Sequence, residues 1–304
     1  MAAQRLQNIS HHLGVSGNST EGLPTFDELP QFHEYKGCAW GIWGNEDQLG
    51  TVNLLSPDVV QRAAREEVQP INYLAQPLFG RKPASIKVLE SRRGPWRQIP
   101  NRDDELNLNT QSGTQWDGLL HVGVLKHGVF YNNFQASLSP VGERTIRPDN
   151  MNDEALKLGI HNWAQHGICG RGVLLDLVGY YTGSGKPLPY DPWASHSITV
   201  AELEACAKAQ GTEFRTGDIL MIRMGFMEKW YAGSVEERNT LTTSKAFTGL
   251  ERSDDMRRFL WNNHFAAVAS DQPALEDVHI KTLERPSLHE TLLGLWGMPI
   301  GKSG

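Results

Sequence analysis

The sequence predicts an α/β domain built on a mixed β-sheet. Helix-start signals alternate with short apolar runs along the chain, and no linker, charge run or repeat divides it after Pro24. The 304 residues are 39% hydrophobic and 21% charged, which excludes disorder, collagen and coiled coil for the chain as a whole. Residues 1–24 are polar and rich in Ser, Asn and Gly, so we expect a mobile N-terminal arm there and a single domain over 25–304.

Three segments carry helix-start signals. Ser56-Pro57-Asp58 supplies an N-cap, an N1 proline and a first-turn acid. Thr199 and Glu202 form the pattern of a capping box, and Gly211 can end that helix. A third helix is expected after Ser253-Asp254-Asp255. This amphipathic helix is expected to carry Met256, Phe259, Leu260 and His264.

Four short apolar runs bounded by turn residues predict strands. These runs are residues 86–89, 173–177, 219–222 and 265–269. Two of them end near a charged residue, Asp176 and Arg223. Helices between buried strands are typical of an α/β or α+β domain with a mixed sheet.

Charge and cysteine content narrow the class of protein. The net charge of −6 argues against a nucleic-acid binder, which needs a basic surface to displace counterions from phosphates. Cys38, Cys169 and Cys206 are scattered, so a disulfide framework is not expected and a reducing compartment is favoured. No stretch approaches the length of a membrane span. We therefore expect a cytoplasmic protein that acts on a small molecule.

Two glycine-rich stretches resemble nucleotide-binding loops, but neither has the neighbouring residues or strand order that such a loop requires. After Gly183-Ser184-Gly185-Lys186, Pro187 occupies the position of the Ser or Thr that would bind magnesium. The glycines of residues 167–172 precede a predicted strand, whereas a dinucleotide fingerprint follows one. No nucleotide cofactor is predicted.

Residues 111–121 carry the most chemical information. In an extended segment, Gln111, Gly113, Gln115 and Asp117 share one face, and His121 follows a bend at Gly118. A carboxylate beside an imidazole can bind a metal or form an acid/base pair in which the acid fixes the histidine tautomer. The alternative is a polar edge strand with a hydrogen-bonded histidine.

This stretch resembles the signature of the cyclase family that includes bacterial kynurenine formamidase and isatin hydrolase, His-x-Gly-Thr-His-x-Asp-x-x-x-His. Gly113-Thr114, Asp117 and His121 match it, while Gln111 and Gln115 replace the first two histidines. The resemblance covers roughly residue 25 to the end of the chain, and it implies a swivelling β/β/α fold and a homodimer or homotetramer. Similar segments occur at residues 40–44, 47–55, 172–176, 214–220, 266–271 and 288–293.

The resemblance also implies a metal site. In the family, the two early histidines and the aspartate bind Zn or Mn, and the last histidine of the signature acts as acid/base or supports the metal ligands from outside. His289 matches a later family histidine, whose partner Glu has no counterpart. The matching region is Gly301-Lys302, so either the chain is truncated there or the second metal position is absent.

The glutamines weaken the implied metal site. An amide oxygen is a weak, hard ligand, whereas imidazole is a strong ligand for Zn. We therefore expect that Gln111, Gln115, Asp117 and His289 hold a divalent metal (Mn, Mg or Zn) weakly or not at all.

The predicted activity is hydrolysis of an amide, lactam or lactone bond in a cyclic or aryl carbonyl compound. Asp117 and His121 would activate water, while Gln115 and Gln111 would donate hydrogen bonds to the substrate carbonyl. The alternatives are a metal-independent cyclase, isomerase or dehydratase, and a non-catalytic protein that binds a small molecule. Three tryptophans could line the substrate pocket or equally belong to the core. They are Trp40, Trp43 and Trp116.

Overall fold

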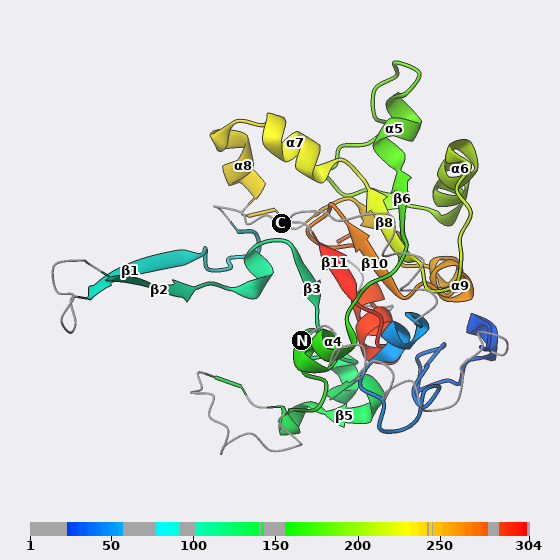
Figure 1. Ribbon diagram of the computed structural model, residues 1–304. Helices are drawn as coiled ribbons and strands as arrows, with labels where there is room; N and C mark the ends of the chain where they lie inside the picture. Colours follow the sequence, from blue (N-terminus) through cyan, green and yellow to red (C-terminus); the bar gives the residue numbers. More distant parts are fainter. Residues whose placement is uncertain are drawn as a thin grey trace.

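A five-stranded mixed sheet forms the centre of the computed structural model (Figure 1). The structure describes residues 23–56, 77–91, 101–139, 141–142, 156–241, 243–244, 246–278 and 286–302. Four strands are parallel, and β3 is an edge strand antiparallel to β11. The strand order is β3 (Gln115–Asp117), β11 (Ile300–Lys302), β10 (Ala267–Ser270), β8 (Ile219–Arg223) and β6 (Gly172–Asp176). The predicted mixed α/β class is confirmed.

Three of the four predicted strands, those now labelled β6, β8 and β10, belong to this sheet, but the run at 86–89 does not. It lies in β1 (Ser85–Ser91), which pairs only with β2 (Asn101–Asn107) in a hairpin that projects from the body (Figure 1). Ile86 and Val88 are 68% and 62% exposed, so the prediction of a buried strand was wrong. A strand face becomes buried only when a second layer of structure packs on it. Here the partner strand β2 contributes several acidic side chains.

The helices flank the sheet, and further strands form small pairs. The described helices are α4 (Ile160–His166), α5 (Leu177–Thr182), α6 (Val200–Gln210), α7 (Phe226–Ala232), α8 (Val235–Leu241) and α9 (Asp254–Asn262). β4 (Val129–Phe130) pairs with β5 (Phe134–Gln135), and β7 (Ser197–Ile198) pairs with β9 (Gly249–Leu250). Within the described ranges, no helix is long and apolar enough to cross a membrane.

Local capping signals place α6 and α9 as predicted. At α6, Thr199 and Glu202 form the capping box, and Gly211 ends the helix in the left-handed conformation at φ 66°. At α9, the Ser253 side chain accepts a hydrogen bond from the backbone N–H of Met256. His264 is not on that helix, because α9 ends at Asn262 and His264 adopts a left-handed φ of 54°.

Two N-terminal predictions fall largely outside the described residues. The helix expected after Ser56 lies in the range 57–76, and residues 1–22 contain almost all of the expected mobile arm. At the end of that arm, the carbonyl of Pro24 accepts a hydrogen bond of 2.7 Å from the indole of Trp261. The limits proposed for the arm and the domain stay predictions.

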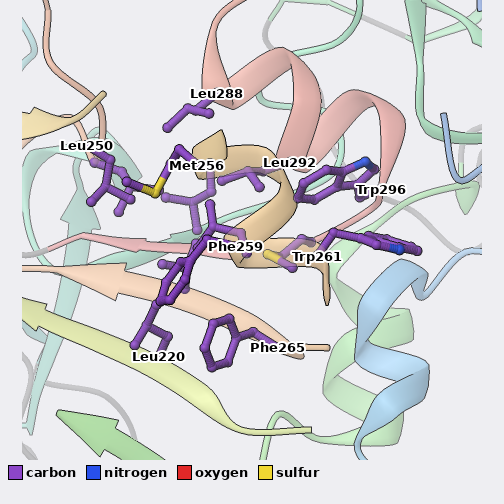
Figure 2. Close-up of a cluster of buried hydrophobic side chains, with 14 of the residues drawn as sticks. Leu220, Leu250, Met256, Phe259, Trp261, Phe265, Leu288, Leu292 and Trp296 are labelled. Carbon is purple, nitrogen blue, oxygen red and sulfur yellow. The ribbon is translucent and has the colours of Figure 1, made fainter. Parts of the chain in front are cut away.

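The main hydrophobic core lies between the sheet, α9 and a π-helical segment, Glu290–Leu295 (Figure 2). Leu220 of β8, Phe259 of α9 and Leu292 of the π-helical segment meet there, and all three are buried. Trp296 extends the cluster and donates a hydrogen bond of 2.6 Å to the carbonyl of Gly37. This packing fixes the start of the π-helical segment, where His289 is located.

Adjacent leucines on β6 provide a test of the core. Leu175 is fully buried, whereas Leu174 points to the other face and is 46% exposed. We predict that Leu175→Ala lowers the free energy of unfolding by about 2–5 kcal/mol, because it leaves a cavity. Leu174→Ala should change it by less than about 1 kcal/mol. Denaturant unfolding of both variants measures the difference, and equal losses would contradict the assigned faces of β6.

Candidate active site

The pairing of β3 with β11 builds the candidate site. In this register Gln115 is opposite Lys302, and Trp116 is opposite Gly301. Because side chains alternate along a strand and paired residues share a face, Gln115, Asp117 and Lys302 lie on one face of the sheet. Trp116 lies on the other face, where Gly301 leaves room: a Cβ on this glycine would be 3.0 Å from the indole ring.

The buried carboxylate of Asp117 is the centre of a cluster. Its Oδ2 atom lies 2.7 Å from Lys302 Nζ, 3.5 Å from His289 Nε2 and 3.8 Å from His121 Nε2. Its Oδ1 atom accepts a hydrogen bond of 2.7 Å from the amide of Gln111. The structure therefore brings together the aspartate, the glutamine and both histidines that the sequence predicted as site residues.

The two glutamines form a chain of amides that ends at Asp117. Gln115 Nε2 donates to Gln111 Oε1 at 3.1 Å, and Gln111 Nε2 donates in turn to Asp117. Lys302 Nζ also lies 3.4 Å from Gln111 Oε1. Each amide nitrogen thus uses one of its two N–H groups within the protein, and the donation to a substrate carbonyl that the sequence suggested stays a prediction. Gln115 Oε1 is buried and has no hydrogen-bond partner within the described part of the chain.

The surroundings of Asp117 and His121 shift the pKa values of both groups. Burial alone would raise the pKa of Asp117, but the hydrogen bond to His289 and the charge of Lys302 together hold it well below its usual range. Burial lowers the pKa of His121, and the charge of Asp117 only partly opposes this. At neutral pH Asp117 is therefore an anion and His121 a neutral imidazole.

His289 is held between two carboxylates. Its Nδ1 atom lies 2.7 Å from Glu276 Oε1, and its Nε2 atom faces Asp117. Glu276 also accepts a hydrogen bond from the backbone N–H of Leu288 and forms an ion pair of 2.8 Å with Arg252. Burial lowers the pKa of His289, but hydrogen bonds to Asp117 and Glu276 outweigh it and raise the pKa above its ordinary value.

Arg81 brings a further positive charge to the site. Its guanidinium stacks on the ring of Phe79 at 4.9 Å, and burial lowers its pKa while the charge of Asp117 acts in the opposite direction. In the described ranges it has no hydrogen-bond or ion-pair partner of its own. Arg252 and Lys302 form ion pairs with Glu276 and Asp117, and Arg81 adds a further positive charge, so the site favours an anion.

Sequence reasoning missed Arg81 and Glu276 altogether, and it treated Lys302 only as the place where a family Glu is absent. Arg81 and Glu276 lie in loops and belong to no motif. The sequence did contain a signal for Lys302. This lysine ends an apolar run and stands in the region that aligns with the family's metal-binding Glu.

The predicted tryptophan pocket has no support from the positions of these residues. Trp116 lies on the opposite face of the sheet from Asp117. Trp40 donates a hydrogen bond of 2.7 Å to the carbonyl of Gly294 and packs on Phe32, and Trp43 packs near Trp261. The alternative, that all three belong to the core, describes these contacts better.

A cavity of about 630 Å³ is located elsewhere on the surface. Tyr190, Pro192 and Lys229 are among its lining residues, and no member of the Asp117 cluster lines it. This cavity therefore contains none of the residues that the sequence predicted for the site.

Comparison with known proteins identifies the class. Residues 10–277 match the cyclase family model, so the chain belongs to the cyclase family. A crystal structure of a cyclase is 29% identical with a TM-score of 0.68, and the match covers 87% of this chain and 85% of that one.

More distant structures include isatin hydrolase A from Labrenzia aggregata, at 10% identity and a TM-score of 0.44, covering 78% of this chain and 76% of that one. A protein described as a predicted metal-dependent hydrolase from Bacillus stearothermophilus is 15% identical, with a TM-score of 0.35 and coverage of 77% and 78%. No curated protein sequence matches the chain.

The donors at Asp117 do not fit the divalent metal that the family signature implies. A metal bound to Asp117 Oδ2 at its usual distance would lie within about 5 Å of the Lys302 ammonium and would be repelled by it. Gln111 is already engaged through both amide atoms. In the part of the chain that is described, no group of three or more His, Cys, Asp or Glu could hold a metal ion. Gln111, Gln115, Asp117 and His289 do come together, but with a lysine among them.

We predict that protein purified without added metal carries well below one Zn, Mn or Mg per chain. The reason is the repulsion between a divalent cation and the Lys302 ammonium. Elemental analysis, together with thermal unfolding before and after chelation, measures this. One tightly held zinc per chain whose removal lowers Tm would show that the site accepts a metal after all.

Proposed function

We propose that the protein hydrolyses an amide, lactam or lactone bond in a cyclic or aryl carbonyl compound. The observation that carries the proposal is the imidazole of His121, with 27% of its side chain exposed, 3.8 Å from the buried carboxylate of Asp117. The pKa of both groups is lowered, which favours a neutral His121 and an ionised Asp117. A neutral imidazole that solvent can reach, next to a fixed carboxylate, has the properties of a general base. Membership of the cyclase family and the matching signature residues support an enzyme of this kind.

The reaction follows from these two groups. His121 accepts a proton from water while the water oxygen attacks the carbonyl carbon and the C=O electron pair moves onto oxygen. The C–N or C–O bond then breaks, and His121 returns the proton to the leaving nitrogen or oxygen. One water is consumed, and a carboxylic acid and an amine or alcohol are formed. Asp117 stabilises the imidazolium that exists between these two steps.

His289 is a positioning residue in this scheme. Both of its ring nitrogens face carboxylates, so neither is free to accept a proton from water. It holds Asp117 in place relative to His121. Glu276 in turn fixes the orientation of the His289 ring.

A cyclase, isomerase or dehydratase would use the same base without consuming water, and incorporation of oxygen from labelled water distinguishes hydrolysis from these reactions.

The expected homodimer or homotetramer and the cytoplasmic location stay predictions.

We predict that His121→Ala lowers kcat/KM by about 10²- to 10⁴-fold, because the general base is lost. Isatin, formanilide and dihydrocoumarin serve as lactam, amide and lactone probes, with products followed by chromatography. His166→Ala is the control, because the one hydrogen bond of the His166 ring within the described ranges is to the adjacent Gly167 carbonyl. Unchanged turnover in His121→Ala would remove this residue from the mechanism, and binding without turnover of any probe would favour a non-catalytic protein.

Arg81 is predicted to select substrates that carry a carboxylate. The charge of Asp117 acts on its guanidinium, which has no side-chain partner in the described structure, and a charge-assisted hydrogen bond contributes about 1.5–3 kcal/mol. Arg81→Met should therefore raise KM about 10- to 100-fold for a carboxylated aryl amide and leave a neutral analogue unchanged. Lys82→Met, on the neighbouring lysine that bonds to Asn107, is the control. Equal effects on both substrates would contradict carboxylate recognition.

A further inference from the structure

We propose that the Lys302 ammonium takes the place of the metal ion that the family signature implies, and that it is the group that binds the oxyanion of the substrate. This inference rests on the proposed hydrolase function for its catalytic part. Its structural part, that an ammonium occupies a metal position, stands independently.

The position of Lys302 is fixed by the sheet. It is the last residue of β11, which lies between β3 and β10, and it faces Gln115 across the β3–β11 pair. Its side chain is only 4% exposed, and an isolated charge at such a depth is strongly unfavourable. The ion pair with the Asp117 carboxylate offsets this cost.

The contacts of this ammonium leave one donor over. An ammonium has three N–H groups. The Lys302 ammonium forms an ion pair of 2.7 Å with Asp117 Oδ2 and donates a hydrogen bond of 3.4 Å to Gln111 Oε1. In the described ranges no third acceptor is within hydrogen-bond distance of Lys302. A donor of this kind, held rigidly and close to the general base His121, is suited to stabilise the negative charge that develops on a carbonyl oxygen.

The glutamines match an ammonium better than they match a metal. Gln111 accepts from Lys302 with its oxygen and donates to Asp117 with its nitrogen, so one amide connects the cation and the anion. The two Gln substitutions and the lysine thus form one consistent set: neutral amides around a fixed single charge.

Metal binding tests the structural part without any substrate. Gln111→His/Gln115→His restores the imidazoles and keeps the lysine, and a triple variant adds Lys302→Glu. We expect the double variant to bind far less than one zinc per chain, and the triple variant to bind about one with a zinc-dependent rise in Tm. Lys302→Gln replaces Lys302→Glu if that triple variant does not fold. Equal zinc binding by the double and triple variants, at any level, would overturn the proposal.

Chemical rescue tests the catalytic part. Lys302→Ala should lower kcat on the isatin, formanilide or dihydrocoumarin probe by about 10²- to 10³-fold, as expected for loss of an oxyanion donor. Ethylammonium should restore part of kcat and also raise the Tm of this variant, whereas ethanol should do neither. A rise in Tm without any recovery of kcat would show that Lys302 is only a structural counter-ion of Asp117. If the wild type hydrolyses none of the probes, the proposed function fails, and zinc binding by the variants still decides whether Lys302 occupies the metal position.

Discussion

The ion pair between Asp117 and Lys302 is the interaction on which the rest of the site depends. Both groups are almost completely buried, and each would be strongly unfavourable there without the other. Because they stand on neighbouring strands of one sheet, backbone hydrogen bonds hold them together in a fixed register. The remaining polar groups of the site are arranged around this pair: Gln111 on one carboxylate oxygen, and the two histidines facing the other.

The two histidines differ in role because they differ in surroundings. His289 lies between Asp117 and Glu276 in the packed interior, where the carboxylates favour its charged form. His121 lies at the margin, partly exposed, where burial favours its neutral form and the charge of Asp117 only partly opposes this. One carboxylate can therefore orient one imidazole as a fixed donor and leave the other as a base. Site chemistry often arises when the environment separates the pKa values of neighbouring groups in this way.

The hydrophobic core also contributes to the geometry of the site. The π-helical segment packs its leucines and Trp296 against α9, and this fixes the backbone at His289. Thus the site lies where a strand pair and a rigid helical segment meet. Such support is what a catalytic constellation requires, because small displacements of the reacting groups cost much of the rate. The projecting β1–β2 hairpin, by contrast, takes no part in this core.

The sequence by itself determined the features that depend on neighbouring residues. The capping box at Thr199 and the apolar runs of β6, β8 and β10 were visible because helix and strand signals are local. The spacing of Asp117 and His121 was visible for the same reason, and the glutamines already indicated a weakened metal site. Only the tertiary structure decided that Ile86 is exposed, that Trp116 faces away from Asp117, and that Arg81, Glu276 and Lys302 converge on the site. Those outcomes depend on strand register and on which layers cover which faces, and neither is encoded in a short stretch of chain.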